Sequence, residues 1–322
     1  MINQFNTKGM TVIVPVHNEE KTIPIFCPTL DSYSATLPFE IELVFVDDGS
    51  EDATVDCLKD YHFKNIKKVK LIKLSKNFGF HAAAYAGICN ATFDICTWIG
   101  VDLQEPLEIL PISYDKLSSS EYDAVYFEKR TVKVSRINRM CSKIYSHLMR
   151  KYAVKRYSND GTATVAFGGK IKDYLNHNVE LNSDLVLQIL DAGFKYITIP
   201  MDYDERSAGE SKWTFSKKIK NFIDSFVSYS YMPIRLVSIA GGIFFLFGLI
   251  IGIITVINRI TDPDVQIGYA TIACLLSLGF GTTDILLGII AEYLWRTLDA
   301  ARKRPVYIVS DIIELSDFQN NT

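Results

Sequence analysis

Residues 98–105 read Trp-Ile-Gly-Val-Asp-Leu-Gln-Glu, and this stretch decides the fold that we predict. The apolar run that begins at Ile95 is typical of a buried strand, and it ends in a turn that carries Asp102, Gln104 and Glu105. In an α/β sheet, ligands bind just beyond the carboxyl ends of the strands. Oxygen donors there suit Mg²⁺ or Mn²⁺, which take one or two carboxylates from a protein while substrate phosphates fill other positions. A solvated acidic turn is the alternative interpretation of this stretch alone.

Three earlier segments repeat the arrangement of an apolar run followed by a polar loop. The runs cover residues 11–16, 41–46 and 69–74, and the loops begin with His17-Asn-Glu-Glu20, Asp47-Asp-Gly-Ser50 and Ser75-Lys-Asn-Phe-Gly79. Helical patterns lie between the runs, and strands that alternate with helices at this spacing predict a mostly parallel sheet. All four loops would then lie at one edge, where a nucleotide is the natural ligand because carboxylates accept hydrogen bonds from ribose and base.

Composition and motifs exclude several classes of protein. No Gly-x-Gly-x-x-Gly follows a strand, and no Gly-x-x-x-x-Gly-Lys-Ser/Thr occurs, which disfavours a dinucleotide fold and an NTPase loop. The net charge is −3, and the basic residues gather near apolar segments, so no nucleic-acid role is expected. The six cysteines form no Cys-x-x-Cys pair and have no His at zinc spacing, so we expect reduced structural thiols.

Two long apolar segments lie late in the chain. No charged residue occurs between Arg235 and Arg259, and residues 267–291 contain only Asp284. Each segment reaches the roughly 20 residues that a membrane-spanning helix needs, so we predict spans at about 236–257 and 267–294. Basic residues on the outer flanks, and no visible signal peptide, predict a cytoplasmic N-terminal part. Residues 133–153 and 214–231 have amphipathic basic patterns, typical of helices at a membrane surface or of ordinary packed helices.

Four motifs occur in an order that resembles the family 2 glycosyltransferases. They are Val14-Pro-Val-His-Asn-Glu-Glu20, Val46-Asp-Asp-Gly-Ser50, Leu74-Ser-Lys-Asn-Phe-Gly79 and Asp102-Leu-Gln-Glu-Pro106. The polyprenyl-phosphate hexosyltransferases, namely bactoprenol glucosyl transferases and dolichol-phosphate mannose synthase, are the most similar group. The resemblance implies an α/β, Rossmann-like GT-A nucleotide-sugar domain. We therefore expect that domain at residues 1–213, a juxtamembrane amphipathic helix at 214–232, two transmembrane helices at 233–296 and a cytoplasmic tail at 297–322.

The resemblance also implies site residues. Nucleotide-sugar contacts would come from Pro15, His17, Glu19, Asp47, Asp48, Asp102, Arg130, Arg206 and Lys212. Asp160 would be the catalytic general base, or would orient the acceptor phosphate or a metal. Asp102 would be catalytic too, and with Gln104 it would bind the metal, Mg²⁺ or Mn²⁺. The family motif reads Asp-x-Asp-x-Gln, whereas this chain has Gly100 at the first position. Metal affinity would then be lower, or Glu105 would help, or the protein is a degenerate relative.

The C-terminal residues complete the resemblance. Residues 292–296 and 304–309 are similar to the end of bactoprenol glucosyl transferases, and residues 306–309 are expected to form a short strand. In relatives such a tail pairs with a neighbouring subunit, which implies a homo-oligomer, namely a tetramer.

The expected function is inverting transfer of one hexose, glucose from UDP-glucose, to undecaprenyl phosphate on the cytoplasmic face of a bacterial inner membrane. It would serve O-antigen or other surface-glycan modification. UDP-N-acetylglucosamine, UDP-galactose, GDP-mannose and UDP-aminoarabinose derivatives remain alternative donors. A separate flippase and a downstream glycosyltransferase are expected partners. A processive synthase is disfavoured because no Gln-x-x-Arg-Trp motif precedes the apolar segments. A non-catalytic nucleotide-sugar-binding scaffold is the remaining alternative, favoured by Gly100.

Overall fold

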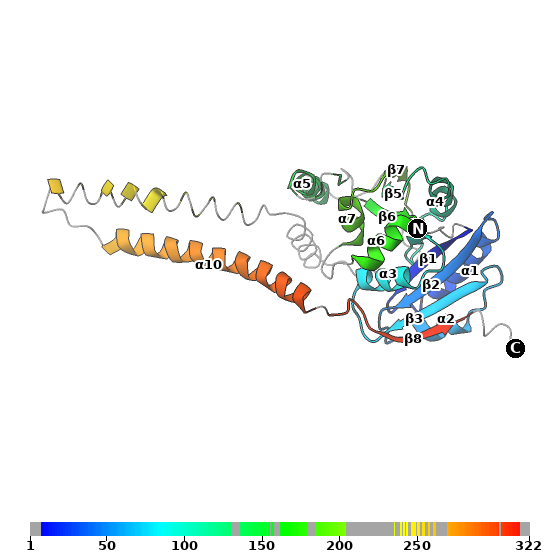
Figure 1. The fold of residues 1–322 in the computed structure, drawn as a ribbon. Helices are drawn as coiled ribbons and strands as arrows, with labels where there is room; N and C mark the ends of the chain where they lie inside the picture. The colour runs from blue at the N-terminus through cyan, green and yellow to red at the C-terminus, as the bar shows by residue number, and fades with distance from the viewer. Residues whose placement is uncertain are drawn as a thin grey trace. The chain divides into compact units, whose positions relative to one another are not determined.

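The structure is a computed structural model of the 322-residue chain. It describes residues 8–129, 136–152, 154, 156–157, 162–178, 184–203, 269–302 and 304–315, with scattered positions between 235 and 261. The strands are β1 (Gly9–Val16), β2 (Glu40–Asp47), β3 (Lys68–Leu74), β4 (Ile95–Trp98), β5 (Ala124–Lys129), β6 (Thr162–Phe167), β7 (Tyr196–Met201) and β8 (Val309–Glu314). The helices are α1 (Ile23–Ser34), α2 (Thr54–Asp60), α3 (Phe80–Cys89), α4 (Ile109–Ser118), α5 (Arg136–Tyr152), α6 (Gly169–His177), α7 (Leu185–Asp191) and α10 (Tyr269–Ala301) (Figure 1).

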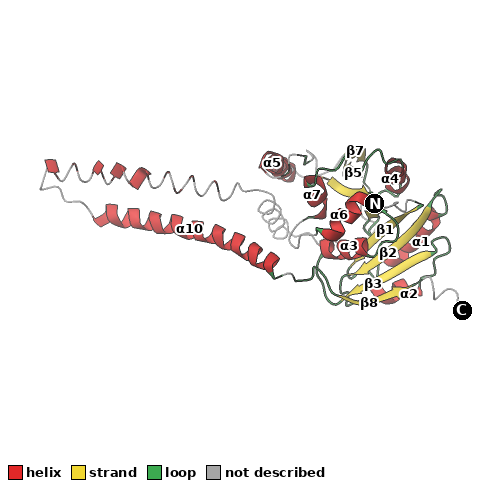
Figure 2. Cartoon of the chain, viewed as in Figure 1, coloured by secondary structure: helices red, strands yellow, loops and turns green. Residues whose placement is uncertain are grey.

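All the strands of the described residues belong to one mixed sheet in the order β7-β5-β6-β4-β1-β2-β3-β8 (Figure 2). The neighbours β4, β1, β2 and β3 are parallel, as the sequence predicts. In contrast, β6 runs antiparallel to both β4 and β5, and β8 runs antiparallel to β3. The carboxyl ends of β1 to β4 therefore share one edge of the sheet with the amino ends of β6 and β8.

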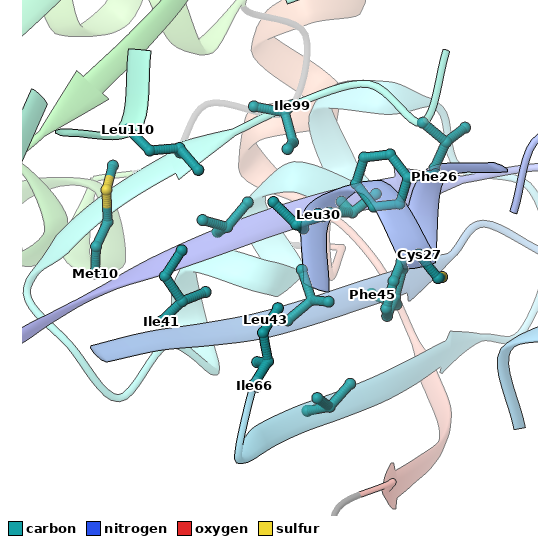
Figure 3. Packing of buried hydrophobic residues seen from close by; sticks show 14 of the residues in the cluster. Met10, Phe26, Cys27, Leu30, Ile41, Leu43, Phe45, Ile66, Ile99 and Leu110 are labelled. Carbon is teal, nitrogen blue, oxygen red and sulfur yellow. The ribbon is translucent and has the colours of Figure 1, made fainter. Parts of the chain in front are cut away.

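The central strands are apolar because both of their faces are covered. Val12, Ile13 and Val14, which alternate between the faces of β1, are all fully buried. On one face, the side chains of α1 and α4 pack against β1 and β2 (Figure 3). The helix α3 contacts β1, β2 and β3, and it supplies a second buried layer of small residues. This two-sided burial gives the loops at the strand ends a rigid base.

Most predicted elements are present with shifted boundaries. The run expected at residues 11–16 is β1, which begins two residues earlier at Gly9, and the helical pattern at 133–153 is α5. The sequence pattern did not predict α4 or α6. Helix α4 buries Ile109, Leu110, Ser113 and Leu117, so a serine interrupts its apolar stripe. That polar residue weakens the apolar helical periodicity of residues 109–118.

The C-terminal strand differs from the prediction in position. The expected strand at 306–309 is a loop that only reaches β8 at Val309, and β8 pairs with β3 of the same chain. The physical reason lies in the side chains, because Ile313 and Leu315 pack on the hydrophobic core. Residues 306–308 are held differently, since Ile308 is half exposed while its carbonyl accepts the N–H of Ser75 at 2.9 Å, and the Tyr307 ring contacts that of Tyr85. The tetramer that the tail implied stays a prediction.

The chain divides into two compact units, Met1–Ser225 with Pro305–Thr322, and Phe226–Arg304. The second unit contains α10, which covers most of the later predicted span. Within the described residues, no helix combines the length and the apolar character that crossing a membrane requires. The two predicted spans therefore stay a prediction.

Candidate functional site

The loops that follow β1 and β2 are joined by hydrogen bonds. The backbone N–H of Asn18 donates to Ser50 Oγ at 2.9 Å, and the N–H of Glu51 donates to Asn18 Oδ1 at 2.9 Å. The N–H of Glu19 donates to Thr54 Oγ1 at 2.7 Å. These bonds pair side chains of one loop with the backbone of the other, so the two loops form a single wall at the edge of the sheet.

The two acids at the end of β2 are buried and hydrogen bonded. Asp47 is 1% exposed, and its Oδ1 accepts the N–H of Ser50 at 3.0 Å. Asp48 is 4% exposed and accepts the N–H groups of Phe78 at 2.6 Å and Gly79 at 2.9 Å. Asp48 therefore holds the loop after β3 against the loop after β2.

The ionised form of Asp48 is disfavoured by burial and favoured by its polar neighbours, and burial has the larger effect. Burial raises the pKa of the Asp48 carboxyl above its usual value, although the N–H donors of Phe78 and Gly79 and the nearby His17 act in the opposite direction. Gly49 makes the close approach of the two loops possible, because it has φ +69° and a Cβ there would lie 2.6 Å from the carbonyl carbon of Lys76.

The predicted residues of the first loop lie in the same wall. Pro15 is opposite Val46 in the register of β1 and β2, and it is partly buried. His17 lies close enough to Asp48 to lower the pKa of that carboxyl. Glu19 Oε2 accepts the hydroxyl of Thr22 at 2.7 Å, so this carboxylate also organises the start of α1.

The loop after β4 carries Asp102 and Gln104. Because β4 pairs with β1, this loop is the neighbour of the first loop. A turn begins at Gly100, whose carbonyl accepts the N–H of Leu103 at 3.4 Å, and Leu103 has φ +53°. The N–H of Gln104 lies 3.5 Å from Asp102 Oδ1. The turn thus places both predicted metal ligands at the edge where the other loops end.

Glu105 has a larger part in this turn than its predicted role as one of several oxygen donors. Its Oε2 accepts the N–H of Gly100 at 3.1 Å, and its Oε1 accepts the hydroxyl of Thr164, on β6, at 3.3 Å. The pKa of the Tyr203 phenol is raised to about 12, mainly by burial and also by the nearby Glu105 carboxylate, although the hydrogen bond with Thr164 acts in the opposite direction. Sequence reasoning missed Thr164 and Tyr203, since neither stands in a recognisable motif.

Four of the predicted site residues, Arg130, Asp160, Arg206 and Lys212, lie outside the described residues. The strands that flank them in sequence are described. β5 ends at Lys129, β6 begins at Thr162 and β7 ends at Met201, and the pairing of these strands puts all three ends at the edge that carries Asp47 and Asp102.

The donor set suits a hard divalent cation. Asp102, Gln104 and Glu105 offer carboxylate and amide oxygens, and a Cβ at Gly100 would fill a space bounded by Asp102 Oδ1 at 2.8 Å and Glu105 Oε2 at 3.3 Å. No group of three or more His, Cys, Asp or Glu side chains in metal-binding geometry occurs among the residues described. The protein part of such a site would therefore be two carboxylates and an amide.

A cavity of about 480 Å³ lies at the other end of the strands. Its walls include Lys8, Phe39, Glu40, Lys68 and Phe93, which precede or begin β1 to β4. It has none of the predicted site residues, and the carboxyl edge remains the candidate site on chemical grounds.

Comparison with known families identifies the class of protein. Residues 11–171 match the family described as Glycosyl transferase family 2, and this match spans half of the 322 residues. The chain therefore belongs to glycosyltransferase family 2, and its mixed α/β sheet is of the GT-A type. The matched segment contains all four loops after β1 to β4.

Several solved structures are similar to this chain. The crystal structure of S. aureus TarS 1-349 has 18% identity, covers 61% of this chain and 59% of that chain, and has a TM-score of 0.43. This chain thus spans about three fifths of the TarS structure. Mannosyltransferase PcManGT from Pyrobaculum calidifontis, in complex with GDP-Man and Mn²⁺, has 16% identity over 92% of this chain and 75% of that chain, with a TM-score of 0.42. Glucosyl-3-phosphoglycerate synthase from Mycobacterium tuberculosis, in complex with Mn²⁺, UDP and glucosyl-3-phosphoglycerate, has 17% identity over 63% of this chain and 73% of that chain, with a TM-score of 0.41.

Proposed function

We propose that this protein transfers one hexose from a nucleotide diphosphate sugar to a polyprenyl phosphate, undecaprenyl phosphate in a bacterium, with inversion at the anomeric carbon. One observation carries the proposal. The loops after β1, β2, β3 and β4 contain the four family motifs, and the strand order brings these loops to one edge of the sheet. The segment that contains them matches the glycosyltransferase family 2 model. UDP-glucose is the first donor to test, because the motifs resemble those of bactoprenol glucosyl transferases.

The reaction needs little proton transfer. A phosphate oxygen of the acceptor forms the new bond to the anomeric carbon, and the bond from that carbon to the donor diphosphate breaks, so that a nucleoside diphosphate leaves. Because a lipid phosphate is an anion at neutral pH, the protein mainly has to position the two substrates and stabilise the departing charge. Asp160 is then proposed to orient the acceptor phosphate, and Arg130, Arg206 and Lys212 to contact the diphosphate.

Asp47 and Asp48 are proposed to contact the base and ribose of the donor. Their burial and their hydrogen bonds to the backbone support this role, because such carboxylates do not have to be ordered when the donor binds. Asp102 and Gln104 would hold the divalent cation, which would neutralise charge on the leaving diphosphate.

A location at the cytoplasmic face of the membrane completes the proposal. The uncharged segment between Arg235 and Arg259 supports it. Large apolar side chains of α10 support it as well, because they are about half exposed or more: Ile272, Leu276, Phe280, Ile285, Leu287, Leu294 and Trp295. Two spans are too few to form a channel, so a separate flippase would carry the product across.

Hexose transfer by the purified full chain tests the proposal. Undecaprenyl phosphate is incubated with radiolabelled UDP-glucose, UDP-N-acetylglucosamine, UDP-galactose or GDP-mannose, with and without EDTA, and the extracted lipid is counted. We expect label from one donor, lost with EDTA and reduced at least about 100-fold by Asp102→Asn. Asp115→Asn, an exposed acid on α4, is the control and should transfer as the wild type does.

Two outcomes contradict the proposal. Label that appears only on a water-soluble acceptor would show that the acceptor is not a lipid. Donor binding without transfer to any acceptor would favour the non-catalytic scaffold, the second candidate, which Gly100 supports by departing from the family motif.

A further inference from the structure

Gly100 stands where the family motif has its first acid, and the structure shows what surrounds that position. A Cβ on residue 100 would meet Asp102 Oδ1 at 2.8 Å and Glu105 Oε2 at 3.3 Å. Among the described residues, the glycines with positive φ are Gly49, Gly79 and Gly193, so Gly100 is not required by its backbone conformation. A side chain at position 100 would instead have to displace the carboxylate groups of Asp102 and Glu105, which occupy the volume that it would fill.

Glu105 is held in this position from two sides. The N–H of Gly100 binds Oε2 at 3.1 Å, and the hydroxyl of Thr164 binds Oε1 at 3.3 Å. The first bond joins the Glu105 side chain to Gly100, at the start of the same loop, and the second joins the side chain to β6. The carboxylate is therefore directed back towards Gly100 and Asp102, and it is ordered by the fold rather than by a ligand.

We propose that Glu105 supplies the carboxylate that Gly100 lacks, and that Glu105 and Asp102 together bind the divalent cation of the donor site. This inference rests on the proposed function, since the cation would bind with a nucleoside diphosphate. A carboxylate oxygen carries more than one lone pair, so an oxygen that accepts a backbone N–H can also bind a cation. Two acids from the protein, with a substrate diphosphate, match the usual coordination of Mg²⁺ and Mn²⁺.

Direct measurement of Mn²⁺ binding tests the assignment without any need for transfer. The concentration of free Mn²⁺ is measured by electron paramagnetic resonance as Mn²⁺ is added to the full chain, in the absence of nucleotide and in the presence of UDP or GDP. Glu105→Gln keeps an oxygen that can accept the N–H of Gly100, but it removes the charge. We expect it to weaken Mn²⁺ binding about tenfold or more. Glu108→Gln, an exposed position three residues further on, is the matched control and should bind as the wild type does.

A second variant tests whether residues at positions 100 and 105 contribute to the same Mn²⁺ site. Gly100→Asp places a third carboxylate beside the two already present, so we expect weaker Mn²⁺ binding from this variant alone. Glu105→Ala empties the space beside residue 100 and should by itself weaken binding. Combined with Glu105→Ala, the new aspartate can take the vacated position, and binding should return towards the wild-type value. Such a large non-additive effect is the signature of two residues in one site.

The outcomes distinguish the assignment of Glu105 to the cation site from the proposed hexosyl transfer. Wild-type affinity in Glu105→Gln, or tighter binding in Gly100→Asp than in the double variant, overturns the assignment, and melting temperatures identify a variant that has lost its fold. If the wild type binds no Mn²⁺ with either nucleotide, the inference fails as well. If Mn²⁺ binds as predicted but no hexose reaches a lipid, the proposed function fails and the assignment of Glu105 stands.

Discussion

At the scale of single residues, the buried acids of the candidate site organise the backbone around them. Asp48 accepts two backbone N–H groups, one with each carboxylate oxygen, and thereby sets the loop after β3. The sequence motif Asp-Asp-Gly-Ser predicted acids at this edge, but it did not predict that one of them holds a neighbouring loop. That assignment depends on the contact between residues 48 and 78, which no local pattern reports.

We predict that Asp48→Asn lowers the free energy of unfolding by about 1–3 kcal/mol. The amide keeps one acceptor oxygen, and its NH₂ group would face the N–H of Phe78 or Gly79, which leaves a donor without an acceptor. Urea unfolding followed by circular dichroism measures the change. Asp60→Asn, at the exposed end of α2, should change the stability by no more than about 0.5 kcal/mol. Equal values for the two variants would contradict the role given to Asp48.

A second buried acid lies at the opposite edge of the sheet. Glu42 is fully buried and accepts hydrogen bonds from Thr11 at 2.6 Å, from the N–H of Thr92 at 2.6 Å and from Lys70 at 3.0 Å. Burial by itself raises the pKa of this carboxyl, but the hydrogen bonds outweigh it, and the pKa lies below its usual 4.5. The folded state therefore binds this proton less tightly than the unfolded state does.

This difference predicts a pH dependence. A carboxyl whose pKa is lowered by folding stabilises the protein above its unfolded pKa, and the contribution is lost as the pH falls from about 4.5 through the lower folded value. Glu42→Gln should cost about 2–3 kcal/mol at pH 7, and the cost should shrink below pH 4. Glu40→Gln, an exposed acid in the same strand, is the control and should show a small effect without this pH dependence. A constant difference from pH 7 to pH 3 would contradict the explanation.

At the scale of elements, the C-terminal strand covers an edge that would otherwise be open. β8 pairs along β3 from Lys70 to Leu74, and the N–H of Leu315 continues the pairing to Val69 at 2.8 Å. Leu315 is 4% exposed in the main core. Unpaired edges promote association between chains, so the residues that follow α10 in sequence also protect the sheet of the first unit.

Leu315→Ala should therefore destabilise the first unit by about 2–5 kcal/mol, the usual cost of a truncated core leucine. Ile312→Ala, in the adjoining strand β8 and 47% exposed, is the matched control with an expected change below about 0.5 kcal/mol. Differential scanning calorimetry of both variants gives the comparison. Similar melting temperatures for the two would indicate that β8 is only loosely attached to the core.

At the scale of the whole molecule, the chain leaves the first unit and returns to it. The first unit consists of Met1–Ser225 and Pro305–Thr322, and the segment between them is rich in apolar residues. Exposed apolar area in water costs about 25 cal/mol per Å², and several large apolar side chains of α10 are exposed. This property is the basis of the proposed membrane location.

We predict that the full chain, expressed in a bacterium, stays in the membrane pellet after an alkaline carbonate wash. Phe280→Arg combined with Leu287→Arg should release much of it, because each arginine in the middle of a span costs about 2.5–3.5 kcal/mol. Ile25→Arg, at an exposed apolar residue of α1, is the control and should remain in the pellet. Wild-type protein that the wash releases in folded form would contradict the proposal.

The sequence by itself determined the alternation of strands and helices up to β4, the parallel β1 to β4 core and the edge at which the polar loops meet. These features follow from short-range periodicity and from rules on strand connection, which a single sequence displays. Only the tertiary structure decided that β6 lies antiparallel beside β4, that β8 joins β3 of its own chain, and that Glu105 occupies the space at Gly100. The reason is physical, because strand partners and side-chain contacts between distant residues depend on how whole surfaces pack. Local periodicity shows which face of an element is buried, but it does not show what that face packs against.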